Sequence, residues 1–140
     1  IGRALNITRT DSCIQTTPEM VAFYKLHNQV PIFPAEDVLK YEALEAVQNF
    51  KPQVVVGCYV TQKYKDGDEI SRTNSSVYGV DEEKMLSMIE KYINVGNFTT
   101  HGDKRIRKHN HKTYKFPWII TRSGQPIHNE IVVYEGLKNG

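Results

Sequence analysis

Apolar residues recur at helical spacing in three parts of the chain. Residues 16–29 carry an apolar face and begin with a Thr-Pro pair, which is typical of a helix start. Residues 34–50 carry a second apolar stripe, and a proline follows shortly after it. Asp81 can cap a third helix over 82–93, which has a stripe of apolar and methionine side chains. The pattern therefore predicts two or three helices.

Other segments have the β-branched or alternating character of strands. A β-branched run opens 53–64, and a Lys-Asp-Gly-Asp turn signal follows, so we predict a hairpin over 53–80. Further strands are predicted at 105–116, 118–122 and 127–134, with a turn around Arg122. No regular alternation of strand and helix is present. The pattern predicts an α+β fold with a mostly antiparallel sheet of about five strands and two or three helices packed on one face.

Length and composition agree with one soluble globular domain over residues 1–140. The chain has 140 residues, of which 39% are hydrophobic and 24% are charged. No apolar run approaches the roughly 18 residues that a membrane-spanning helix needs. No signal peptide is visible, and the first residue is Ile1, which is expected of a processed product, an isolated domain or an incomplete record. Composition alone leaves the compartment and the oligomeric state unknown.

The charges are distributed very unevenly along the chain. The formal net charge is +2, yet no Asp or Glu occurs from Lys104 to Asn129, where seven Lys and Arg residues lie. The remainder therefore carries 2 − 7 = −5. A chain polarised in this way can present one cationic surface, which would attract phosphates, acidic proteins or anionic lipid.

The stretch 103–118, DKRIRKHNHKTYKFPW, concentrates this positive charge. Placed on a strand, its alternating positions give two faces that are both largely polar or charged, so the strand must lie at an edge or on an exposed arm. We therefore predict a cationic edge strand over 104–115 and a contact surface that includes the turn after it. The candidate binding residues are Lys104, Arg105, Arg107, Lys108, Lys112, Tyr114, Lys115 and Arg122.

Three interpretations of this strand are open. Lys and Arg side chains neutralise phosphates, and Tyr114, Phe116 and Trp118 offer rings on which unpaired bases can stack, which favours nucleic acid. The same surface suits an acidic protein or a nucleoprotein assembly. Lysines at a sheet edge also prevent aggregation without binding anything. The main hypothesis is a non-enzymatic binding protein with an anionic partner.

Histidines in the same stretch raise a second hypothesis. His109 and His111 would lie on one strand face, with His101 upstream, and three imidazoles suit zinc or another divalent ion. The pattern H-x-D-x5-H-x-H resembles the three-histidine motif of HUH nucleases and relaxases. That family has a hydrophobic residue between its paired histidines, where this chain has Asn110, and a catalytic tyrosine in a definite context. The resemblance would imply a metal-dependent nuclease.

A third hypothesis is a secreted or virion-exposed interaction domain. It would join Cys13 to Cys58 in one disulfide and carry sugars on the sequons at Asn6, Asn74 and Asn97. The alternative for the two cysteines is a pair of buried thiols. No P-loop, G-x-S-x-G or HExxH motif is present, so no cofactor and no catalytic residue are predicted.

Overall fold

The chain has an α+β fold, as its sequence predicts. A computed structural model describes residues 2–68, 75–119 and 125–137. These residues form two compact units, 1–46 and 47–140. The single domain over 1–140 stays a prediction. Arg122, Asn74 and most of the strand expected at 118–122 lie outside the described residues.

The first unit is built from short elements. They are α1 (Gly2–Leu5), β1 (Thr10–Asp11), the 3₁₀ helix η1 (Ile14–Thr16), α2 (Pro18–Leu26), β2 (Leu39–Lys40) and the start of α3 (Ala43–Phe50). β1 and β2 pair in parallel. Arg3 and Arg9 both bind the carboxylate of Asp37.

Two of the predicted helices are present, one of them shortened. α2 begins as expected because the Thr17 hydroxyl accepts a hydrogen bond from the backbone N–H of Met20 at 3.4 Å, and Pro18 occupies the first turn. α3 begins only at Ala43 instead of at residue 34. The reason is that Leu39–Lys40 pairs with β1 as a strand, so the helix can begin only after this pairing ends.

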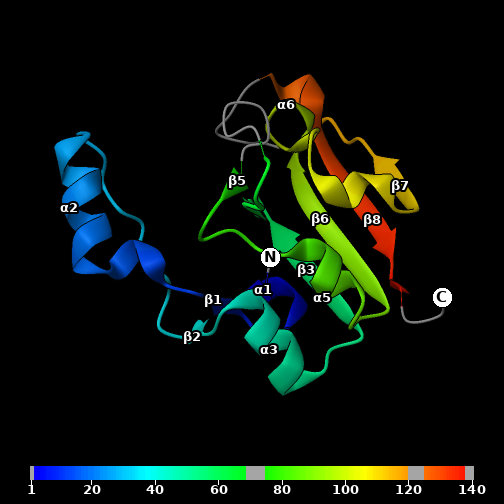
Figure 1. The fold of residues 1–140 in the computed structure, drawn as a ribbon, viewed down its shortest axis with the longest axis horizontal. Coiled ribbons are helices and arrows are strands. Elements are labelled where there is room, and N and C mark those ends of the chain that lie inside the picture. Colours follow the sequence, from blue (N-terminus) through cyan, green and yellow to red (C-terminus); the bar gives the residue numbers. More distant parts are fainter. Residues whose placement is uncertain (1, 69–74, 120–124, 138–140) are drawn as a thin grey trace. The chain divides into compact units, whose positions relative to one another are not determined.

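The second unit is organised around a mixed sheet of four strands in the order β3-β6-β8-β7 (Figure 1). The strands are β3 (Val54–Cys58), β6 (Lys91–Asn97), β8 (Asn129–Glu135) and β7 (His111–Tyr114). β3 and β6 are parallel, whereas β8 runs antiparallel to both of its neighbours. Two of the three pairings are therefore antiparallel, and the sheet has one strand fewer than expected.

The hairpin predicted over 53–80 is wrong. β3 ends at Cys58 and pairs with β6, more than thirty residues further along the chain. The turn around Gly67 exists, with φ +92° at Gly67, but the two short strands that flank it run parallel. These strands are β4 (Gln62–Lys63) and β5 (Ser75–Ser76). A local turn signal fixes the turn and leaves the long-range pairing open.

The third predicted helix is mostly wrong. α5 covers only Glu82–Leu86, although Asp81 caps it as predicted by accepting a hydrogen bond from the N–H of Lys84 at 3.3 Å. Residues 91–97 instead form β6, which lies between β3 and β8. Its even-numbered residues from Tyr92 to Gly96 are buried, with half-buried residues between them, so the segment has the period of a strand. Pairing on both sides overrides the helical spacing of its apolar residues.

The strand predicted at 105–116 is only partly confirmed. Residues 111–114 form β7, which lies at the edge of the sheet as predicted. Arg105–Lys108 forms a 3₁₀ helix, η2, and not a strand. η2 buries Ile106 in the core, and its basic side chains reach acids on several other elements.

One face of the sheet is covered by helical elements. Tyr92, Asn94 and Glu130 lie on this face, where their side chains contact α5 and η2. His101 of α6 (Phe98–His101) contacts the backbone of Asn97 at the end of β6. η3 (Pro126–His128) leads into β8. The core of this unit consists of buried apolar and aromatic side chains, chiefly Met85, Leu86, Ile89, Tyr92, Ile106, Val132 and Tyr134. Helical elements on one face agree with the predicted α+β class, but they are α5, α6 and η2, whereas the helices predicted at 16–29 and 34–50 begin in the first unit.

Candidate functional site

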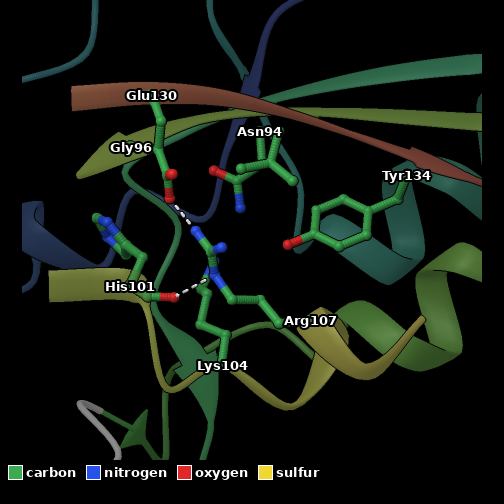
Figure 2. Close-up of a pocket in the computed structure, with 8 residues that line it drawn as sticks. Asn94, Gly96, His101, Lys104, Arg107, Glu130 and Tyr134 are labelled. Atoms are coloured by element: carbon green, nitrogen blue, oxygen red, sulfur yellow. Dashed lines mark hydrogen bonds and ion pairs between the residues drawn. The ribbon is translucent and has the colours of Figure 1, made fainter. Parts of the chain in front are cut away.

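A small polar pocket lies between β6, β8 and the α6–η2 segment (Figure 2). Strands supply one side, and the residues from His101 to Arg107 supply the other. The space that the centre of a water molecule can occupy there is about 10 Å³. The lining residues are Asn94, Gly96, His101, Lys104, Arg107, Glu130, Val132 and Tyr134.

A buried ion pair stands next to this pocket. Lys104 and Glu82 have side chains that are 4% and 2% exposed, and the distance from Nζ to Oε1 is 2.7 Å. The same carboxylate oxygen accepts hydrogen bonds from the Tyr92 hydroxyl at 2.8 Å and the Asn94 amide at 3.2 Å. Burial lowers the pKa of Lys104, and the neighbouring carboxylate opposes that shift. Lys104 is therefore a structural cation in this conformation, beyond the reach of a surface partner.

Other predicted binding residues are also neutralised by acids. Arg105 Nη1 lies 2.6 Å from Asp68 Oδ2, Arg107 pairs with Glu130, and Lys108 Nζ lies 2.7 Å from Glu83 Oε1. The acids come from α5, β8 and the turn after β4. The sequence segregates the charges, but the fold brings them together. The expectation of an exposed cationic strand over 104–115 is thus incorrect for its first half.

Contacts with these basic residues lower the pKa of two of the acids. Lys108 is the largest cause of a pKa of about 2 at Glu83, with smaller contributions from His109 and Lys65. The pKa of Asp68 is also lowered, first by the N–H of Lys65 and then by Arg105.

His101 has a defined place at the pocket. Its Nδ1 lies 3.1 Å from both the backbone nitrogen and the carbonyl oxygen of Asn97. Burial, and then Lys104, lower its pKa, which keeps the imidazole neutral at pH 7. Gly96 leaves space for the ring, because a Cβ at this position would lie 2.9 Å from Nδ1. Gly96 therefore allows a close approach between the ring and strand β6.

The tyrosines of the site were missed by reasoning from the sequence. Tyr92 and Tyr134 stack with ring centroids 6.0 Å apart. Burial raises the pKa of Tyr134 to about 12 and that of Tyr92 well above its usual value, so both hydroxyls stay protonated. The alternation of residues along β6 and β8 could have indicated that these rings share a face.

The remaining part of the predicted surface is exposed. Residues 112–118, KTYKFPW, are all exposed, and we call them the basic-aromatic segment. Tyr114 is 44% exposed, and Phe116 and Trp118 stack at 4.9 Å while 37% and 67% exposed. Within the described part of the chain, Lys112 and Lys115 have no ion pair.

Lys112 and Tyr114 lie on the face of the sheet opposite to the pocket. Lys112 is opposite Val133 and Tyr114 is opposite Ile131, whereas the pocket uses Glu130, Val132 and Tyr134. Because side chains alternate along a strand, the two sets point to opposite sides.

The candidate metal-binding histidines do not form a cluster. His109 Nε2 lies 3.1 Å from Glu83 Oε1, while His111 contacts the Tyr134 ring and the His109 carbonyl. His101 is bound to Asn97. Among the described residues, no three His, Cys, Asp or Glu side chains are grouped as a metal site requires.

The hypothesis of a secreted domain rests on two cysteines and on the sequons, and the structure describes both cysteines and two of the sequons. Cys13 and Cys58 are free thiols, the first half-buried and the second exposed, so the expectation that both are buried is wrong. Asn97 is fully buried and its amide binds Asn129 at 2.8 Å, which leaves no room for a sugar in the folded chain. Asn6 is exposed.

Comparisons with known proteins give no further guidance. The chain matches no family model, no curated protein and no solved structure. In the described part of the chain, none of the helices has both the length and the apolar character needed to cross a membrane. The function must therefore be argued from the chain's own surfaces.

Proposed function

We propose that the protein is a non-enzymatic binding protein whose basic-aromatic segment contacts an anionic partner, and that this partner is single-stranded nucleic acid. The observation that carries the proposal is the exposure of every residue from 112 to 118, where two lysines alternate with three aromatic rings. The surface is smaller than the sequence predicts and lies further along the chain.

The charges of the segment support an anionic partner. Lys112 and Lys115 are the predicted binding cations that stay exposed without an ion pair within the described residues, so they can neutralise phosphates without breaking the fold. Lys104, Arg105 and Arg107 already hold acids and would have to abandon them to bind a phosphate. We therefore assign these three residues to the stability of the fold.

The rings of the segment favour unpaired bases over a duplex. Trp118, Phe116 and Tyr114 present large aromatic surfaces to solvent. Stacking on such rings requires bases that are not already stacked within a double helix, and each stacked base contributes about 1–3 kcal/mol. An acidic protein would use the lysines without needing the rings, so the two classes of partner depend on different residues.

Fluorescence of the single tryptophan tests the proposal directly. Single-stranded oligonucleotides should quench Trp118 and bind with an affinity that falls as salt rises. A variant with Lys112→Ala and Lys115→Ala should reduce the slope of log affinity against log salt by about 1.4, or 0.7 for each phosphate contact. Trp118→Ala lacks tryptophan, so its binding is followed by the anisotropy of a labelled oligonucleotide. This variant should bind more weakly with the slope unchanged.

A matched control removes the same charge elsewhere. Lys63 and Lys84 are exposed residues of the same unit, so Lys63→Ala with Lys84→Ala should leave binding unchanged. If this control weakens binding as much as the Lys112 and Lys115 variant, the attraction is due to net charge and the segment is not the site. If an acidic peptide binds and oligonucleotides do not, the partner is a protein.

A further inference from the structure

The pocket between β6 and β8 contains one buried polar atom that lacks a partner among the described residues. Asn94 is 4% exposed, and its Oδ1 accepts no hydrogen bond from any described residue. Its amide nitrogen is already used by Glu82 at 3.2 Å, which fixes the orientation of the side chain. Tyr134 points its hydroxyl toward the same space (Figure 2). Leaving a buried acceptor unpaired costs about 1–3 kcal/mol.

The charges around the pocket select a neutral ligand. Lys104 and Arg107 are cations, but each is paired with a carboxylate, Glu82 and Glu130 respectively. Their charges sum to zero. An ion of either sign would be buried without a counter-charge of its own, because these charges are already paired with one another.

The size of the pocket limits that ligand to one or two atoms. The space open to the centre of a water molecule is about 10 Å³, which is close to the minimum of about 10–15 Å³ for one bound water. Water can donate to Asn94 Oδ1 and accept from Tyr134, and a buried water usually makes about three hydrogen bonds.

We propose that this pocket is a binding site for one ordered water molecule, which links Asn94 of β6 to Tyr134 of β8 beside the two ion pairs. The water belongs to the fold, because it satisfies a buried acceptor that the chain itself leaves unpaired. The pocket shares no lining residue with the basic-aromatic segment, and Lys112 and Tyr114 of that segment point to the other face of the sheet.

A crystal structure of the full chain, at a resolution that shows ordered water, is the primary test. The proposal requires one density peak within hydrogen-bond distance of both Asn94 Oδ1 and Tyr134 Oη. A pocket without density overturns it, as does an Asn94 amide that has rotated to bond with a protein group instead.

A filling substitution gives a second test that does not depend on crystals. Val132→Ile adds one methylene at the pocket, and Val133→Ile makes the same change on the opposite face of β8. If a water is bound, Val132→Ile displaces it and lowers the urea midpoint relative to Val133→Ile. An equal or higher midpoint means that the added methylene fills a dry gap, and it overturns the proposal.

Discussion

Replacing Lys104 by methionine should remove a large part of the protein's free energy of unfolding. The substitution keeps the length of the side chain and removes its charge, leaving the Glu82 carboxylate 2% exposed without a cation. Breaking a buried ion pair in this way costs about 3–5 kcal/mol. Single domains are stable by only about 5–15 kcal/mol, so the loss is large.

A second substitution tests whether the loss comes from the unpaired carboxylate of Glu82. Adding Glu82→Gln to Lys104→Met should recover at least half of the loss, because a neutral amide can still accept from Tyr92 and Asn94.

Urea unfolding followed by circular dichroism measures all of these values. The control is Lys108→Met, whose side chain is 65% exposed and pairs with Glu83 at the surface; it should cost about 1 kcal/mol or less. The reasoning is refuted if Lys104→Met stays within about 1 kcal/mol of the wild type, or if the effects of Glu82→Gln and Lys104→Met simply add.

Three further substitutions test single contacts of the fold. The folded pKa of the Glu83 carboxyl is about 2, below its ordinary value of 4.5, so the ionised carboxylate stabilises the fold above pH 4.5 and this stabilisation is lost as the pH falls toward 2. In an acid titration the wild type should therefore lose about 1 kcal/mol of stability that the Glu83→Gln variant does not lose. The pKa of His101 is lowered in the fold, so the wild type should lose stability as the pH falls below 6.5. The urea midpoint of His101→Gln should change less with pH in this range, and an equal pH dependence in both proteins would contradict this. Gly96→Ala should cost about 1–3 kcal/mol in urea unfolding because its Cβ meets the His101 ring, and an unchanged midpoint would show that the ring can move freely.

Capping signals in the sequence predicted where two of the helices begin. Thr17 and Asp81 cap the helices that follow them, because a side-chain acceptor at a helix start acts over three residues. The strand at 129–135 and the edge position of β7 also agree with expectation. The α+β class follows from the same signals.

The pairing of strands that are distant in the chain could not be predicted from the sequence. Residues 82–93 carry methionine and apolar side chains at helical spacing, yet the chain turns after Leu86 and enters β6. The strand is fixed by β3 on one side and β8 on the other, and neither partner is near in sequence.

The pairing of the charges at 104–108 is also long-range. Counting charges along the chain predicts a cationic surface at 104–108, whereas Asp68, Glu83 and Glu130 arrive from other elements to neutralise it. Only a structure shows which charges meet. The rings and lysines of 112–118 were predicted as candidates, but the exposure that distinguishes them from their neighbours was not.

Titration of the wild-type protein with a labelled single strand and its duplex, across a salt series, tests the central claim most directly. The account predicts quenching of Trp118, tighter binding of the single strand than of the duplex, and an affinity that falls as salt rises. Binding that leaves Trp118 fluorescence unchanged, or an absence of binding even at low salt, would contradict it.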